Sequence, residues 1–171
     1  MRLTLPLALL AATVMAVPVR AAPLEIGGAM QSREVDCGGR DVTISGMGNR
    51  ITLSGECGHI IVGGARHVIA LPSAASLDVS GEGNSVTVSG KLRGLLLVNG
   101  AQERVEAGIG TGPDARVEVN GAEARLRLRL AGPIRISLAG ARHEVVWTAP
   151  PGVPVPQAEI SGEGNVLRRG D

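Results

Sequence analysis

The chain contains almost no aromatic side chains. Among its 171 residues there is no Phe and no Tyr, and Trp147 is the only aromatic residue. Glycine is frequent, at 25 residues, and Val, Ile and Leu are abundant. Since large rings are missing, the core must be thin and built from medium-sized aliphatic side chains in a repeated geometry. A site that stacks sugars on aromatic platforms also finds little support.

The chain also lacks a strong excess of charge of either sign. It has 17 basic and 16 acidic side chains, and without residues 1–21 it loses Arg2 and Arg20, which leaves 15 against 16 and a net charge of −1. A protein that binds nucleic acid or an anionic membrane surface through its overall charge needs a clear positive balance. We therefore expect no nucleic-acid partner.

Long apolar runs are absent after the N-terminus, so no transmembrane segment is expected in the mature protein. Residues 1–21 are typical of a secretory signal peptide: Arg2 gives a positive start, Leu3 to Val17 are mostly apolar, and Val19-Arg20-Ala21 offers small residues to a signal peptidase. A transmembrane anchor is the alternative, but a run of about 15 residues is short of the roughly 20 that span a bilayer. We expect cleavage after Ala21 and a periplasmic or secreted bacterial product.

Only two cysteines are present, Cys37 and Cys57. An even number of cysteines in an exported protein predicts a disulfide, with two free thiols as the alternative. A metal site needs more ligands than these, and no His or carboxylate cluster lies near them in the sequence. No metal or other cofactor is expected.

The abundant residues follow a repeat of about 19 residues. Its template is apolar-x-apolar-x-Gly, four residues, then apolar-x-apolar, and it occurs eight times. Of the 32 apolar template positions, 28 carry a large apolar side chain, two carry Ala and two carry Arg, and both arginines are in the first and last copies. The template glycines, separated by 18, 18, 17, 19, 21, 19 and 22 residues, are Gly28, Gly46, Gly64, Gly81, Gly100, Gly121, Gly140 and Gly162.

Each half of the template alternates with period two, which predicts a short strand with one buried face. The glycine marks a point where the chain turns or packs too closely for a Cβ. Two architectures fit: a β-solenoid with one repeat per coil, or a series of hairpins. Two-residue hairpin turns require positive φ at both turn residues, and pairs such as Ala65-Arg66 and Ala101-Gln102 suit them poorly.

We therefore predict an all-β, single-domain β-solenoid over residues 22–171, with about eight coils of roughly 19 residues and two short strands per coil. Its extra residues fall in 108–114 and 148–157, two turn-rich loops. Cys37 and Cys57 are 20 residues apart, close to one period. Adjacent coils about 4.8 Å apart are within the Cα separation that a disulfide tolerates.

Several segments resemble a bacterial family called domain of unknown function 3060. They are CGGRDVTISGMGNRITLSGECGHIIVGG, SLDVSGEGNSVTVSG and the terminal ISGEGNVLRRG. The resemblance covers residues 35–100 and 158–170, whereas residues 101–157 follow only the repeat. It implies export and a β-repeat fold, and it transfers no catalytic residues because the family has no assigned activity.

The twice-occurring SGEGN, at 80–84 and 161–165, does not match a ligand loop. A dinucleotide fingerprint needs Gly-x-Gly-x-x-Gly between a strand and a helix, and SGEGNSVTV leads into a second strand. Calcium-binding nonapeptide repeats need Asp in the turn, and none is present. We interpret the motif as a corner of the solenoid.

The third residue after each template glycine forms a column, which we interpret as a ladder of turn residues because Asn tolerates the left-handed conformation. His67 and His143 of the two GARH segments belong to it and are expected at the surface. They lie four coils apart and cannot share a metal ion, and His59 has no evident carboxylate partner. The column reads Gln31, Asn49, His67, Asn84, Glu103, Ala124, His143 and Asn165.

The segment RLRLRL at 125–130 is the sharpest functional feature. Its leucines are template positions, so Arg125, Arg127 and Arg129 should point outward together, with Arg135 soon after. These four arginines are a candidate anion-binding stripe for lipopolysaccharide, an acidic glycan or an acidic protein. The alternative is ordinary cross-strand pairing, because the register places Arg127 beside Glu106 and Arg125 beside Glu144.

The sequence thus predicts an exported, non-enzymatic scaffold or binding module of the bacterial envelope, with an envelope protein or an acidic glycan as partner. Open solenoid ends favour self-association unless they are capped. The alternative is a carbohydrate-active β-helix enzyme that acts on an acidic polysaccharide. That reaction needs two clustered carboxylates, and the carboxylates of residues 103–144 are scattered.

Overall fold

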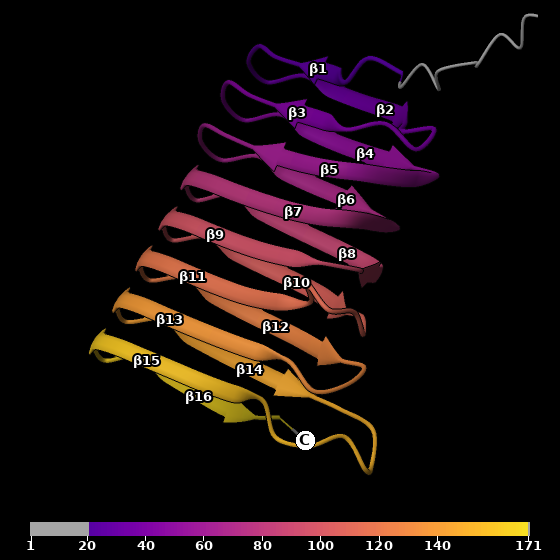
Figure 1. Cartoon of the computed structure of the whole chain (residues 1–171). Helices are drawn as coiled ribbons and strands as arrows, with labels where there is room; N and C mark the ends of the chain where they lie inside the picture. The colour runs from indigo at the N-terminus through magenta and orange to yellow at the C-terminus, as the bar shows by residue number, and fades with distance from the viewer. Residues whose placement is uncertain (1–20, 171) are drawn as a thin grey trace, which may run out of the picture.

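The computed structural model describes residues 21–170, and this part of the chain is built from strands with no α-helix. Figure 1 shows the strands as a regular stack from the N-terminus to the C-terminus. The signal peptide predicted for residues 1–21 lies almost wholly outside the described residues and stays a prediction. No helix in 21–170 has the length and apolar character to cross a membrane. The strands are β1 (Leu24–Ile26), β2 (Ser32–Asp36), β3 (Val42–Ile44), β4 (Arg50–Ser54), β5 (Glu56–Val62), β6 (Val68–Leu71), β7 (Ser73–Glu82), β8 (Ser85–Leu92), β9 (Leu95–Ala101), β10 (Arg104–Ile109), β11 (Arg116–Ala122), β12 (Arg125–Leu130), β13 (Arg135–Ala141), β14 (Glu144–Thr148), β15 (Gln157–Glu163) and β16 (Val166–Arg169).

The strands form two parallel stacks. Odd-numbered strands pair with odd-numbered neighbours and even with even, one coil apart, and every pairing among the described residues is parallel. The odd stack lies in front of the even stack in Figure 1, and the two are joined by one bridge between Ala74 and Leu92. The β-solenoid of about eight coils is confirmed. The hairpin alternative is wrong, because hairpins pair antiparallel strands.

The core lies between the two stacks and consists of the inward-facing template positions. Strands such as β12 alternate between exposed and buried residues along their whole length, as expected for strands with one dry face. Arg33 and Arg169, at inward positions of the first and last coils, are exposed. The last coil has no neighbour beyond it, so Ile160 is 51% exposed. Self-association through such open ends stays a prediction.

Every coil turns from its odd to its even strand at the template glycine. These glycines stack directly, as in the register Gly100 to Gly121 to Gly140. A Cβ built on Gly121 or Gly140 would overlap the carbonyl oxygen of the glycine one coil earlier. The prediction of a position too close for a Cβ is therefore confirmed.

The residue two positions after each template glycine has a left-handed backbone, with φ between 53° and 67° in all eight coils. Three coils place Gly there, and the two SGEGN segments supply Gly83 and Gly164. Five coils carry a side chain in this region, which L-residues rarely adopt. SGEGN is thus the least strained version of a corner that every coil makes.

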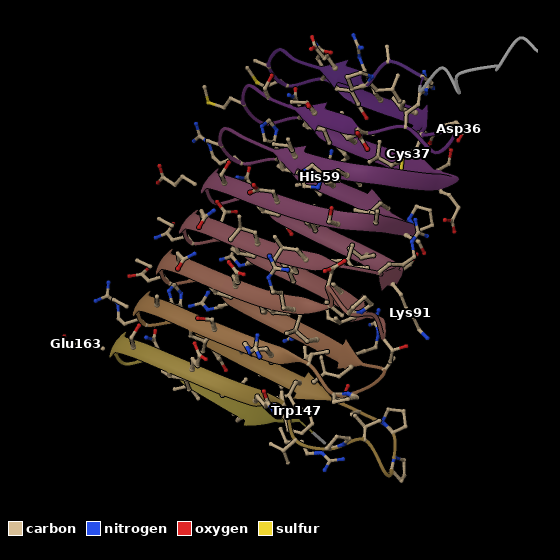
Figure 2. All side chains as sticks on the ribbon, viewed as in Figure 1. Asp36, Cys37, His59, Lys91, Trp147 and Glu163 are labelled. Atoms are coloured by element: carbon tan, nitrogen blue, oxygen red, sulfur yellow. A yellow bond between two sulfur atoms is a disulfide. The ribbon has the colours of Figure 1, made fainter. Side chains whose placement is uncertain are left out.

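The predicted disulfide is present. Cys37 and Cys57 are joined, with Cα atoms 5.0 Å apart, and both are buried. Cys37 follows β2 and Cys57 lies in β5, so the bond links neighbouring coils where the even strands return to the odd stack. Figure 2 places Cys37 at the N-terminal end of the stack, so the disulfide staples the first coils.

Candidate anion-binding groove

The arginines of RLRLRL lie side by side on the outer face of the even stack. In β12 the three leucines are buried and Arg125, Arg127 and Arg129 are exposed. Alternation along a strand makes this outcome unavoidable once Leu126 and Leu128 fill the core. The predicted placement of these three arginines is confirmed, and anion binding by them stays a prediction.

Arg135 does not belong to this stripe. It begins β13, in the odd stack, where it pairs with Arg116 and Gln157. The chain turns through Gly132 and Pro133 between β12 and β13. Arg135 is therefore close to RLRLRL in the sequence but lies on the opposite sheet. Its assignment to the stripe is wrong as to position.

Arg104, and not Arg135, is a fourth arginine on the face that carries Arg125, Arg127 and Arg129. It lies directly beside Arg125 in the parallel register of β10 and β12, and both side chains are exposed. Two like charges on adjacent strands destabilise each other unless an anion lies between them. The sequence contained this signal, because Arg104 and Arg125 occupy the same template position four residues after their glycines.

Carboxylates neighbour the row, but they engage other arginines. The predicted register is confirmed: Glu106 lies beside Arg127, and Glu144 beside Arg125. The ion pairs differ, however, because Glu106 binds Arg129 at 2.8 Å and Glu144 binds Arg168 at 3.2 Å. None of the ion pairs found within residues 21–170 includes the side chains of Arg104, Arg125 or Arg127.

These three arginines line a surface groove of about 700 Å³ that crosses β8, β10, β12 and β14 and ends at β16. Five arginines and two glutamates contribute to the groove and its edge: Arg104, Arg125, Arg127, Arg129, Arg168, Glu106 and Glu144. Since each of the two glutamates already has an arginine partner, the groove carries an excess of three positive charges, and of the three arginines Arg125 also acts electrostatically on Glu123 outside the groove. The groove is therefore suited to an anion with several acidic groups.

A ladder of buried polar side chains lies at the corner behind the template glycines. His67 and His143 are buried, with exposures of 0% and 1%, so the expectation that they lie at the surface is wrong. Their Nδ1 atoms accept the backbone N–H of the column residue one coil earlier, from Asn49 at 3.1 Å and from Ala124 at 3.2 Å. Their Nε2 atoms lie 3.2 Å from the carbonyl oxygens of Gly63 and Ala139, four residues back.

The asparagines of the column make the same contacts. Oδ1 of Asn84 accepts the N–H of His67 at 2.9 Å, and Nδ2 of Asn84 donates to the carbonyl of Ser80, four residues back, at 3.2 Å. Asn and neutral His are thus interchangeable here, because each offers one acceptor and one donor in the same directions. The ladder interpretation is confirmed, and its purpose is to satisfy buried backbone groups.

Glu103 is the exception in the column. Its carboxyl is fully buried and accepts the N–H of Asn84 at 2.9 Å and the side-chain amide of Asn84 at 3.1 Å. Burial raises the pKa of Glu103 to about 7; the Asn84 hydrogen bonds oppose this rise, and the nearby Glu82 adds slightly to it. One coil later Ala124 has no acceptor to offer the N–H of Glu103, so the ladder is interrupted there.

A small polar cluster lies on the odd stack, on the other sheet from the groove. Nδ1 of His59 is hydrogen-bonded to Oγ of Ser76. Burial raises the pKa of Asp78, and the charge of His59 partly opposes this rise. The interpretation that His59 lacks a carboxylate near it is therefore wrong, because β5 and β7 bring Asp78 close enough to interact electrostatically.

Residues 44–94 match the family model described as "Protein of unknown function (DUF3060)". The chain is similar to that family over this segment. No curated protein and no solved structure matches the chain. The resemblance noted in the sequence is thus confirmed over this part of it.

The DUF3060 segment runs from the end of β3 to the residue before β9 and contains Cys57 and the complete coils of β5 with β6 and of β7 with β8. It includes three members of the ladder, Asn49, His67 and Asn84. Most of the arginine groove follows it, since Arg104, Arg125 and Arg127 lie beyond residue 94. The DUF3060 match therefore covers the corner architecture, whereas the groove is a feature of the later coils.

Proposed function

We propose that this protein is an exported, non-enzymatic binding module of the bacterial envelope, and that its arginine groove binds an anionic envelope component. The observation that carries the proposal is the row of Arg104, Arg125 and Arg127, exposed, adjacent and in none of the ion pairs of the described residues. A buried disulfide is consistent with an oxidising compartment.

The separation and the ion pairs of the two carboxylates in the groove favour a binding role over hydrolysis. Glu106 and Glu144 are two coils apart and offset by two residues, which places their Cα atoms on the order of 12 Å apart. Glycosidases use two carboxyl groups about 5–10 Å apart. Here both carboxylates are also held by arginines, Arg129 and Arg168, an arrangement better suited to shaping a groove than to transferring protons.

Retention on an acidic glycan matrix tests the proposal. The protein and a variant with Arg104, Arg125 and Arg127 changed to Ser are eluted from immobilised polygalacturonate with increasing salt. We expect the protein to be retained and the variant to elute at clearly lower salt, because surface anion binding is screened by salt.

A matched control separates the groove from general charge. Arg33, Arg50 and Arg135 are exposed, make no ion pair within the described residues and lie outside the groove. Changing these three to Ser removes the same charge and should leave retention nearly unchanged. Equal losses in the two variants would overturn the proposal. Export is tested separately, since the protein recovered from the periplasm or medium should begin at Ala22.

A further inference from the structure

A second hollow, of about 500 Å³, lies beside the arginine groove on the even stack. We call it the trough. It is lined mostly by apolar or side-chain-free residues, and Lys91 and Arg129 are its charged members. Figure 2 shows Lys91 reaching outward at the end of its strand. The apolar members of the lining are Gly90, Gly108, Leu130, Ala131, Ala149 and Pro150.

Part of the floor of the trough is bare backbone for a structural reason. A Cβ on Gly108 would overlap the carbonyl oxygen of Gly90, and a Cβ on Gly90 would crowd the carbonyl oxygen of Pro72. The register between β8 and β10 shifts at this point, between Glu106 and Gly108. Neither glycine can therefore carry a side chain over this surface, and the side chain that crosses it is that of Arg129, which donates to the carbonyl of Val88 at 3.2 Å.

The trough and the arginine groove adjoin. Thr148 lines both hollows. Arg129, in the trough, is ion-paired to Glu106, in the groove. The trough extends from β8 to β14, three coil spacings or about 14 Å, and the groove runs beside it and on to β16. Arg104, Arg125 and Arg127, on β10 and β12, thus lie alongside the middle of an apolar channel.

We propose that the groove and the trough together bind one molecule of an anionic amphiphile, with its acidic head group on Arg104, Arg125 and Arg127 and its alkyl chain in the trough. This inference rests on the proposed function and names the chemical class of its ligand. A hydrophilic glycan would satisfy the arginines and leave the apolar channel in water. An alkyl chain covers it, because burying apolar surface is favourable.

The net charge of the chain does not conflict with this assignment. A mature charge of −1 gives no long-range attraction to an anionic membrane surface. A local excess of three arginines alongside an apolar channel instead selects a single amphiphile by contact. The expected ligand is therefore taken up as a monomer.

Three probes separate the contributions of head group and chain: dodecyl phosphate below its micellar concentration, inorganic phosphate without a chain, and dodecyl maltoside without a charge. Binding is measured by calorimetry on the mature protein. We expect dodecyl phosphate to bind at least tenfold more tightly than either of the other two. Comparable affinity for all three would overturn the inference.

Two kinds of variant locate the binding. Ala131→Phe fills the trough and should weaken dodecyl phosphate at least tenfold while inorganic phosphate is unaffected. Ala70→Phe, at an exposed position of β6 outside both hollows, is the matched control and should change neither. Ala149→Phe replaces Ala131→Phe if the latter does not fold, as judged by circular dichroism. Unchanged dodecyl phosphate affinity in the folded trough variant would refute the placement of the chain.

The arginine variant distinguishes the two proposals. If Arg104, Arg125 and Arg127 are needed for glycan retention but dodecyl phosphate binds no better than phosphate, the amphiphile is wrong and the proposed function stands. If dodecyl phosphate binding survives the loss of these arginines, the trough binds alkyl chains alone and the amphiphile is wrong as well. Loss of dodecyl phosphate binding in both the arginine and the trough variants supports the inference.

Discussion

Replacing Glu103 by Gln should stabilise the solenoid at neutral pH and remove one source of its pH dependence. Every other polar residue of the described ladder from Asn49 onward donates a hydrogen bond to the carbonyl four residues back, as Asn84 does to Ser80. An ionised Glu103 has no proton to donate, and it carries a charge into a fully buried site. Gln keeps one acceptor for the N–H of Asn84 and supplies the missing donor; the side-chain amide of Asn84 loses its bond to residue 103 but keeps the carbonyls of Gly64 and Ser80 as acceptors.

The magnitude follows from the pKa of Glu103, which burial raises from 4.5 to about 7 in the folded protein. The folded state then binds more protons than the unfolded state between these values. The contribution of Glu103 to the free energy of unfolding is therefore fully present below pH 4.5 and is lost as pH rises through 7. At about 1.36 kcal/mol per pKa unit, the loss is on the order of 3 kcal/mol.

The assay is urea denaturation of the protein and of Glu103→Gln at several pH values from 4.5 to 8. The difference between their free energies of unfolding should grow by on the order of 3 kcal/mol in favour of the variant as pH rises, because other titrating groups cancel in the difference. Glu163→Gln, at an exposed corner of the last coil, is the control and should give a flat difference. A flat difference for Glu103→Gln would refute the reasoning.

Three further predictions concern the frame of the solenoid. Gly121→Ala should prevent folding or cost at least about 3 kcal/mol in the free energy of unfolding, because its Cβ would overlap the carbonyl oxygen of Gly100. Gly152→Ala, with no atom near its Cβ and a similarly positive φ, should cost about 1 kcal/mol in the same urea denaturation experiment. Equal costs for the two variants would contradict the close-approach argument. Changing Cys37 and Cys57 to Ser should lower the free energy of unfolding by about 3 kcal/mol, the loop-closure value for 20 residues, and intact mass that is unchanged by reduction of the parent protein would show that the bond does not form. Ala124→Asn should restore the ladder by accepting the N–H of Glu103 and raise the free energy of unfolding by about 1 kcal/mol, whereas Ala124→Val, which adds bulk without an acceptor, should not raise it.

The repeat, the strands and the corner could be predicted from the sequence because they depend on alternation and on a glycine at a constant place. A period near 19 with a template glycine determines which residues face the core, and Leu126 and Leu128 face inward as expected. The parallel pairing is predicted because the turn residues suit hairpins poorly, which leaves the solenoid, whose stacked strands are parallel. These features are local or repeated, so each copy of the template reinforces the others.

The burial of the two histidines is not predicted from the sequence, because a polar side chain is ordinarily expected at the surface. His67 and His143 occupy the same column as Asn49 and Asn84, and that column could have indicated their burial. The corner carbonyls and amides need polar partners inside the coil, and His provides them as well as Asn does. Arg135 was misplaced for a different reason, since a sharp turn at Gly132 and Pro133 moved it to the other stack.

The direction of the corner ladder has a consequence for how the chain is made. Except at Glu103, the corner amide of a coil is satisfied by a side chain of the coil that follows, as the N–H of His67 is by Asn84 and that of His143 by Asn165. A chain that emerges N-terminus first therefore ends, at most stages, in a coil whose amide still lacks its acceptor, and the next coil supplies it. The disulfide between Cys37 and Cys57 lies at the start of this sequence, where it gives the growing stack a fixed base on which later coils can be added one at a time.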